Sequence, residues 1–348
     1  LMILLLQAGS LRSLEYATYD IRFQLKPRVT QSPLISVMEI DDDSLKYIGR
    51  WPWRRSVYAE ALDEMRKLDA RMVVFDVEFT EPSARVLSQE DMVEFPKRVR
   101  AELDGLRDEL ARFRSGLDRI GLSAATRILA DFEKNIALRR DAIVARIAQV
   151  GQNDDQAFAL AVARNGRVIL PVRCYPAENR ETPEHAWVHE IYGIRPERMV
   201  SRPGPGIKDR WLDIPASPLH RGARRLAFTN VDTDEDGTRR RIALFREWRG
   251  RLYPQLAFAT LLAPATGAGS GVAVTNLEFV PGSHALLRGI VLPGETAPRD
   301  IRIPVDDRGQ MLIDWAGVWT ESFARFSFAD LFEYIRVKES VQELFAGV

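Results

Sequence analysis

The residues best placed to do chemistry form one acidic turn, Asp232-Thr233-Asp234-Glu235-Asp236-Gly237-Thr238. Its Asp-x-Asp-x-Asp-Gly beginning is typical of a calcium loop, in which closely spaced carboxylates surround a glycine bend. A calcium loop also needs a bidentate acid at its twelfth position, and that position is Ala243 here. The turn therefore lacks an essential calcium ligand.

The same turn contains the pattern Asp-x-Asp-Gly-Thr, which is found in haloacid-dehalogenase-like phosphatases. Such enzymes use the first Asp as a nucleophile and the second as an acid or base. Their hydrophobic strand runs directly into the first Asp, whereas polar Asp232 and Thr233 come first here. A phosphatase using Asp234 and Asp236 is therefore the alternative to a simpler interpretation, an Asp/Gly hairpin turn.

A second candidate site lies at the ends of two predicted strands. Asp41 follows the apolar run 34–40, and Asp76 lies in the run 71–79. Open parallel sheets bind ligands where their strands end, so these acids could hold a cation or polar ligand between them. The ligand-binding candidates are Asp41, Asp43, Trp51, Trp53, Arg54 and Asp76.

A structural interpretation of the same residues is favoured over ligand binding. Asp42, Asp43 and Ser44 are ordinary helix-capping residues. The run Trp51-Pro52-Trp53 would fill the end of the sheet as part of the core. The sequence therefore leaves ligand binding and fold stabilisation as alternatives.

The elements that would position these residues follow from hydrophobic periodicity. Residues 34–82 are predicted as strand, helix, strand, with the helix over 56–68. A further helix is predicted over 154–163 and a strand over 167–172. More strands are expected over 225–231, 241–246, 272–280, 301–305 and 311–315, with helices over 254–262 and 328–335. We therefore predict an α/β fold with a mixed, mostly parallel sheet flanked by helices.

A charged segment over 88–150 interrupts this pattern. Its apolar residues from Val99 to Ile120 alternate steps of four and three, which is the spacing of a coiled-coil seam. Gly121 and Ser123 then supply a break and a new helix cap. We expect a long helical-hairpin insertion that is inert, an arm for a homodimer or a surface for another partner. A non-sensing scaffold that dimerises through Val99 to Ile120 is thus a further alternative function.

The N-terminal residues suggest a membrane. Leu1 to Leu6 are wholly apolar, but a bilayer span needs about 20 such residues. This piece is expected to end a truncated transmembrane helix or a signal sequence, with a buried helix start as the alternative. A membrane-proximal helix ending at Lys26-Pro27 should follow, so that 1–28 precede a domain over 29–348. Tyr19, Asp20 and Arg22 lie where this helix would meet the domain and are signal-coupling candidates.

Composition restricts the function further. The chain has 348 residues, 46% of them hydrophobic, which suffices for a substantial core. Forty-nine basic and forty-nine acidic side chains balance, so charge does not favour nucleic acid as a partner. The single cysteine, Cys174, is expected to be a buried thiol. His185 and His189 have a spacing that suits metal ligands on a helix, but Thr182-Pro183 favours a loop, and we expect no metal and no cofactor.

Several short segments together carry a family resemblance. In chain order they are Tyr19-Asp20-Ile21-Arg22, Met38-Glu39-Ile40-Asp41-Asp42-Asp43-Ser44-Leu45, Gly49-Arg50-Trp51-Pro52-Trp53-Arg54-Arg55, Val74-Phe75-Asp76-Val77-Glu78-Phe79, Asp155, Thr229-Asn230, Asp234-Glu235-Asp236-Gly237-Thr238-Arg239-Arg240 and Phe326-Ser327-Phe328-Ala329-Asp330-Leu331. This order resembles the CHASE type-2 sensor family.

The resemblance implies a non-catalytic, extracytoplasmic (periplasmic) sensor domain of a bacterial transmembrane receptor. In that family, membrane helices flank the domain, and an adenylate or guanylate cyclase, a histidine kinase or a Ser/Thr kinase follows in the cytoplasm. The implied partners are an unknown small-molecule or protein signal, the membrane and a second copy of the chain. The hairpin is longer than the family needs, and the family would add a final strand after Val348. No ligand comes with the resemblance.

Overall fold

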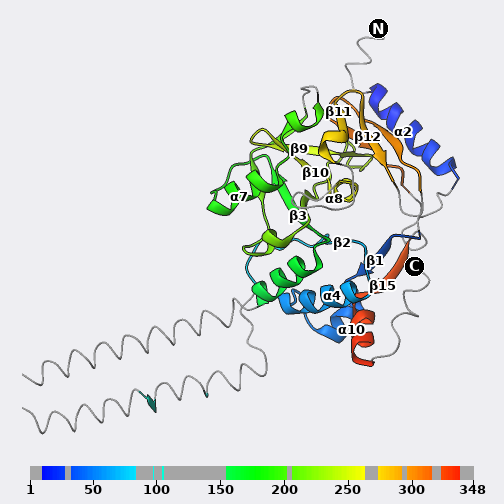
Figure 1. Cartoon of the computed structure of the whole chain (residues 1–348). Coiled ribbons are helices and arrows are strands. Elements are labelled where there is room, and N and C mark those ends of the chain that lie inside the picture. The colour runs from blue at the N-terminus through cyan, green and yellow to red at the C-terminus, as the bar shows by residue number, and fades with distance from the viewer. Residues whose placement is uncertain are drawn as a thin grey trace, which may run out of the picture.

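A computed structural model describes residues 10–27, 33–83, 97, 104–105, 154–201, 206–262, 273–291, 296–315 and 323–337. Nearly all of the predicted helical hairpin over 88–150 lies outside the described residues, as do Leu1 to Leu6. The described residues form an α/β fold in which helices pack around several small sheets (Figure 1).

The strand β3 (Val168–Tyr175) is the centre of the largest set of pairings around the main core. It pairs in parallel with β2 (Val73–Val74) and β7 (Arg225–Phe228), and antiparallel with β6 (Trp211–Asp213). Its residues are almost all buried, as expected for a strand that is covered on both faces. This confirms the strands predicted near 167–172 and 225–231.

The strand β1 (Ser36–Glu39) has a partner that the sequence did not reveal. It pairs in parallel with β15 (Ala324–Ser327), with Glu39 opposite Ser327, and not with β2. The expectation that Asp41 and Asp76 end neighbouring strands is therefore wrong. The strand β15 is short and partly exposed, so its sequence contains no apolar run from which a strand could be predicted.

Three other sheets complete the fold. One has the order β10 (Arg251–Pro254), β9 (Phe245–Trp248), β5 (Ile207–Asp209); the second is β13 (Arg299–Pro304), β12 (His284–Ile290), β11 (Leu277–Val280), β4 (Val200–Ser201); the third pairs β14 (Gln310–Leu312) with β8 (Arg241–Ala243). Of the ten strand pairings in the described residues, five are parallel and five antiparallel. The expected mostly parallel sheet is therefore not found in this part of the chain.

Most predicted helices are present. The helix α2 (Ser10–Leu25) ends directly before Lys26-Pro27, and α3 (Asp42–Ile48) follows β1. The helices α4 (Arg55–Lys67) and α10 (Phe328–Val337), and a helix over 154–165, confirm the three amphipathic predictions. The helix α8 (Leu256–Ala259) is shorter than predicted because Pro254 belongs to β10. Short 3-10 turns lie at η1 (Pro196–Arg198), η2 (Leu219–Gly222) and η3 (Val274–Asn276).

One helix replaces an expected loop. The helix α7 (Pro183–Tyr192) carries both His185 and His189, where Thr182-Pro183 had favoured irregular structure. Proline at the first helical turn costs nothing because its missing N–H would have no intrahelical partner there. The Thr-Pro pair is thus the start of this helix, and the loop prediction is wrong.

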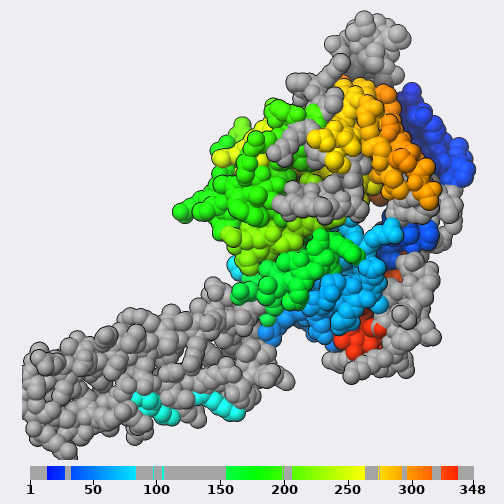
Figure 2. All heavy atoms as spheres, viewed as in Figure 1, coloured from blue at the N-terminus to red at the C-terminus, as the bar shows by residue number. Residues whose placement is uncertain are grey.

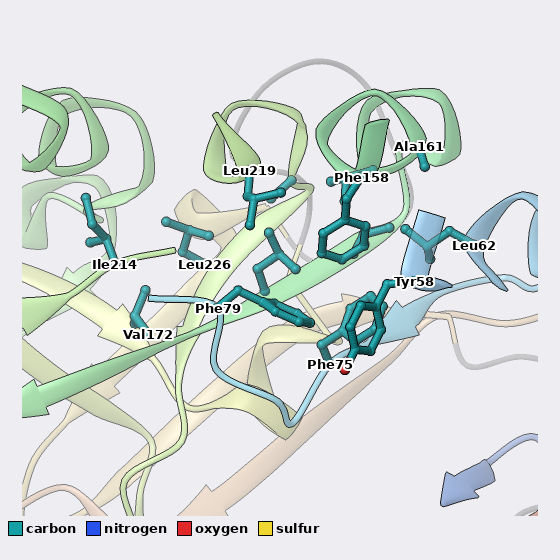
Figure 3. Packing of buried hydrophobic residues seen from close by; sticks show 14 of the residues in the cluster. Tyr58, Leu62, Phe75, Phe79, Phe158, Ala161, Val172, Ile214, Leu219 and Leu226 are labelled. Atoms are coloured by element: carbon teal, nitrogen blue, oxygen red, sulfur yellow. The ribbon is translucent and has the colours of Figure 1, made fainter. Parts of the chain in front are cut away.

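The main core is aromatic. The rings of Tyr58, Phe75, Phe79 and Phe158 converge from α4, the segment after β2 and the helix over 154–165 (Figure 3). The ring centroid of Phe79 lies 5.1 Å from that of Phe158 and 5.2 Å from that of Tyr58, in edge-on arrangements that aromatic rings prefer. Cys174 joins this core as the predicted buried thiol.

A second core lies between β9 and the sheet of β11, β12 and β13, where Phe245, Phe258 and Phe279 pack together. The helix α2 lies on the surface of this part, beside the segment that contains β13 and β14 (Figure 2). Among the described residues, no helix has both the length and the apolar character needed to cross a membrane.

The aromatic core predicts a large difference between two residues of one helix. Phe158 is fully buried, whereas Leu160 is 53% exposed. Phe158→Ala should lower the free energy of unfolding by about 3–5 kcal/mol, because it leaves a cavity among packed rings. Leu160→Ala should change it by only about 0.5 kcal/mol. Urea unfolding followed by circular dichroism compares them, and equal losses would contradict the assigned core.

Candidate functional site

The acidic turn is closed by its own backbone. The Asp234 N–H donates to the Thr238 carbonyl at 2.8 Å, and the Gly237 N–H donates to the Asp234 carbonyl at 2.9 Å. Gly237 has a φ of 82°, a backbone conformation that favours glycine. The strands on either side, β7 and β8, pair with β3 and β14 and not with each other. The turn is therefore a connection between sheets, and the hairpin interpretation is wrong.

A buried arginine neutralises this turn. Arg240 is only 3% exposed, and its guanidinium donates to Asp236 Oδ1 and Oδ2 at 2.9 Å and to Asp234 Oδ2 at 3.2 Å. It also forms a bidentate pair with Asp20 of α2, with Nη2–Oδ2 and Nε–Oδ1 distances of 2.6 and 2.8 Å. Two parallel N–H···O bonds of this kind fix orientation as well as charge. Arg240 thus joins α2 to a turn 220 residues away.

The surrounding groups keep this cluster ionised. Arg241 Nη1 lies 2.9 Å from Asp234 Oδ1, so two guanidinium groups face three carboxylates. Hydrogen bonding from Arg240 holds the pKa of Asp20 below its ordinary value and lowers that of Asp236 to about 2. The Tyr16 ring of α2 lies 4.6 Å from the Arg240 guanidinium carbon, in the geometry of a cation–π contact.

Other residues of α2 dock on the segment after β14. The Tyr19 hydroxyl donates to the Ile313 carbonyl at 3.0 Å, and Lys26 forms an ion pair with Asp314. The Trp315 indole donates to the Arg239 carbonyl at 3.2 Å, which ties this segment to the acidic turn. Arg22, by contrast, donates to the Thr18 carbonyl of its own helix. Of the three predicted coupling residues, the structure therefore brings Tyr19 and Asp20 onto the domain.

The opposite face of α2 is exposed. Leu14, Ile21 and Leu25 lie on it, and all three are more than half exposed. The helix is therefore held by polar and aromatic contacts along one side, and not by burial of an apolar stripe. Contacts of this type contribute less than core packing, since a partly exposed ion pair is worth only about 1 kcal/mol or less.

Asp41 has a structural role. Its Oδ1 accepts hydrogen bonds from the Ser44 N–H at 2.9 Å, the Ser44 hydroxyl at 2.6 Å and the Ser327 hydroxyl at 2.7 Å. The bonds from Ser44 and Ser327 lower the pKa of Asp41 to about 2, because they favour the ionised carboxylate. Asp41 is therefore the N-cap of α3, one residue before the segment that the capping interpretation named, and it also binds β15.

Sequence reasoning missed Ser327, although a local signal was present. Ser327 and Asp330 have the spacing of a capping box, and the Ser327 N–H donates to Asp330 Oδ2 at 2.9 Å. The Ser44 hydroxyl, fully buried, accepts from the Ala329 N–H at 3.2 Å. The start of α10 is thus bound to the start of α3.

Of the two tryptophan candidates, Trp53 lies in the core and Trp51 is exposed beside it. Trp53 is buried, its indole donates to the Gly49 carbonyl at 2.8 Å, and its ring lies 5.3 Å from that of Phe328. Trp51 packs edge-on against Trp53 at 5.4 Å and is partly exposed. These contacts are those of the alternative in which the Trp-Pro-Trp run fills the end of a sheet.

The charged ligand-binding candidates have different partners in the structure. Arg54 pairs with Asp154 at 2.8 Å, and Asp43 pairs with Lys46 at 2.8 Å on the surface. Partial burial and the neighbouring Glu78 raise the pKa of Asp76. Since β1 and β2 belong to different sheets, no hydrogen-bonded ladder places Asp76 beside Asp41. Ligand binding by these residues stays a prediction.

A second buried arginine was also missed. Arg246 binds Asp209 at 3.0 Å and Asp232 at 2.5 Å, and Gln310 donates to Asp232 at 3.4 Å. Every carboxylate that begins the calcium-like pattern is therefore bound to an arginine. In the part of the chain that the structure describes, no group of three or more His, Cys, Asp or Glu side chains is arranged to hold a metal ion.

The family follows from comparison of the whole chain. A model of the CHASE2 domain matches residues 1–347. The chain belongs to the CHASE2 domain family. CHASE2 domains are extracytoplasmic sensor domains of membrane receptors. No curated protein and no solved structure matches this CHASE2 domain.

The Asp41 cluster gives a prediction for the CHASE2 domain. Asp41→Ala should lower the free energy of unfolding at pH 7 by about 1–2 kcal/mol, because α3 loses its cap. Asp43→Ala removes only an exposed pair and should cost no more than about 0.5 kcal/mol. Thermal unfolding compares the two variants, and a cost as small as that of Asp43→Ala would contradict the role of Asp41.

The loss of stability caused by Asp41→Ala should depend on pH. The folded pKa of Asp41, about 2, lies below its ordinary value of 3.8, so its ionised form contributes stability that is complete above the ordinary value. As the pH falls from 3.8 toward 2, wild type loses this contribution. The difference between wild type and Asp41→Ala should therefore narrow over that interval, and a constant difference would argue against an ionised cap.

Arg240 gives a second prediction, on the attachment of α2. Arg240→Gln removes the cation shared by three carboxylates, so amide hydrogens of α2 should exchange about tenfold faster or more, the effect of losing one or two charged hydrogen bonds. Arg239→Gln alters an exposed neighbour and should leave α2 unchanged. Hydrogen–deuterium exchange by mass spectrometry measures both, and equal exchange in the two variants would refute the role of Arg240.

Proposed function

We propose that this CHASE2 domain senses a signal outside the cytoplasmic membrane and passes it to the membrane through α2. The observation that supports this most directly is the Asp20–Arg240 pair, which attaches α2 to the acidic turn of the domain. The N-terminal residues 1–28 would carry the connection to the membrane. A cytoplasmic cyclase or kinase module of the same receptor would give the output.

The mechanism follows from how weakly α2 is held. Among the described residues, α2 is held by the Asp20–Arg240 pair, a hydrogen bond from Tyr19 and cation–π contacts of Tyr16 with two arginines, and its apolar face is exposed. Lys26, directly after α2, adds an ion pair with Asp314. A ligand changes a conformational equilibrium only by its difference in affinity for the two states, and a weakly held helix needs only a small difference. Signal binding or dimerisation would thus shift α2 between attached and displaced positions.

The proposed receptor acts as a homodimer, and its signal is a small molecule or a protein. Catalysis by the acidic turn receives no support from the contacts, because Arg240 and Arg241 already bind Asp234, and Arg240 binds Asp236. A phosphatase nucleophile must be free to attack phosphorus. The turn is therefore proposed as a joint between α2 and the domain.

The test uses the intact membrane receptor and its own output. Asp20→Asn keeps the size of the side chain but weakens the pair with Arg240, so it should change the output without signal by about several-fold. Glu15→Gln makes the same chemical change at an exposed position of the same helix. It should leave the output unchanged.

Two outcomes separate the possibilities. A change with Asp20→Asn that Glu15→Gln does not reproduce supports transmission through α2. Wild-type output from both variants, with and without signal, would refute it.

A further inference from the structure

Three of the four histidines of the chain lie on or beside the helix α7. His185 and His189 lie on α7, and His220 lies on η2, which packs against it. Each packs on a tryptophan: the centroid distances are 4.4 Å for His185–Trp211, 5.2 Å for His189–Trp248 and 5.2 Å for His220–Trp187.

The hydrogen bonds of His185 fix a neutral tautomer. Its Nδ1 accepts from the Thr182 N–H at 3.1 Å, and a backbone N–H can only donate. Its Nε2 lies 3.1 Å from the Leu212 carbonyl oxygen, which can only accept, so this nitrogen carries the hydrogen. Protonation of Nδ1 would remove the acceptor for Thr182. The capping box that starts α7 exists only while His185 is neutral.

His220 is fully buried, and one of its two ring nitrogens makes no hydrogen bond to the described atoms. Its Nδ1 donates to the Pro215 carbonyl at 3.1 Å, whereas its Nε2 has no hydrogen-bond partner among the described atoms and no solvent contact. A proton added at Nε2 would place a charge in the interior without an acceptor, which is costly. The Tyr192 hydroxyl of α7 donates to the His220 carbonyl at 2.7 Å, so this ring and α7 form one packed unit.

The charged neighbours of the three histidines have opposing effects on the histidine pKa values. Glu181, Glu184 and Asp213 favour a proton on His185, and Glu184 favours one on His220, which Arg221 and His185 oppose. At His189, Glu190 and Glu181 favour the proton, whereas Arg251 and Arg249 oppose it. Burial outweighs the acids, so the pKa of each of the three histidines lies below its ordinary value of 6.5.

We propose that α7 and η2 form a proton-binding site in which acid outside the membrane protonates His185 and His220 and releases α7 from the domain. The proton is then one signal of the sensor, and this role as a signal rests on the proposed sensing function. The release of α7 by acid does not rest on that function, because it can be observed in the isolated chain. As α7 leaves, the bonds from Arg251 of β10 to the carbonyls of His189 (2.7 Å) and Glu190 (3.0 Å) would part. Val188 and Tyr192 would also leave the main core.

The sign of the effect follows from linkage. A histidine whose folded pKa lies below its unfolded value contributes stability that is complete above pH 6.5 and is lost as the pH falls toward the folded value. Each such histidine changes the equilibrium constant for opening by up to about tenfold per pH unit below 6.5. Two histidines together would change the equilibrium constant for opening by up to about a hundredfold per pH unit.

The experiment follows α7 in the whole chain by hydrogen–deuterium exchange between pH 7.5 and 5.0, corrected for the intrinsic exchange rate. Wild-type protection of α7 should fall steeply below pH 6.5. His185→Gln keeps a capping-box acceptor that does not titrate, and His220→Asn keeps a donor for Pro215. The double variant, in which His189 is the one histidine of the three that can still take a proton, should lose protection less steeply than wild type, by at most about tenfold per pH unit. His284→Asn, on β12, removes the fourth histidine and should behave as wild type.

Histidine NMR of the wild-type chain provides a measurement that needs no variant. Two or more of the four imidazole signals should titrate well below pH 6.5, together with the loss of α7 protection. Constant α7 protection in wild type to pH 5.0 would overturn the proposal. So would a double variant that folds, by circular dichroism, and still loses protection as wild type does. Neither result would affect the α2 test of the sensing function, since that test reads Asp20 in the intact receptor.

Discussion

The buried guanidinium of Arg240 is the interaction on which the arrangement of α2, the acidic turn and β8 depends. Three carboxylates converge on it from two distant parts of the chain. Without a cation, bringing Asp20, Asp234 and Asp236 together would be unfavourable because like charges repel in a partly buried site. Arginine suits this position better than lysine, since its planar fork offers five donors that can bind several carboxylates at once. The acids that suggested a metal or a nucleophile are thus satisfied by a cation of the chain itself.

The N-terminal and C-terminal parts of the domain are bound to each other along two adjoining segments. α2 leads into β1, while residues 313–315, which α2 contacts, lead toward β15, and β1 pairs with β15. Asp41, Ser44 and Ser327 then join the helices that follow the two strands. These contacts are polar, whereas the aromatic core is apolar. Local openings come from regions with few buried apolar contacts, so α2 can move without unfolding the core, whereas α10 carries Phe328 and Leu331 into it.

Local patterns predicted what local physics determines. The helix α4 was predicted because burial imposes a period on its residues, and the strand β3 because it is a continuous apolar run. A helix cap after β1 was predicted from local residue types, but the capping residue is Asp41. Pairings between distant segments leave no such pattern. The Asp20–Arg240 pair spans 220 residues, and β15 is too short and exposed to signal a strand. The helix α7 was mistaken for a loop because Thr-Pro both ends and begins helices, and only its capping bond with His185 distinguishes the two cases.

The strand β9 connects the histidine unit to the acidic turn. Arg246 and Trp248 are two residues apart on this strand, so their side chains lie on the same face. Trp248 packs on His189 of α7, and Arg246 binds Asp232, which is two residues before the Asp234 that Arg240 holds. Coupling between distant sites requires a contiguous set of packed groups and an element that has two arrangements. β9 supplies the packed groups. α2, held by polar and aromatic contacts, and α7, which the proposal releases by protonation, are the elements at its two ends that would change position.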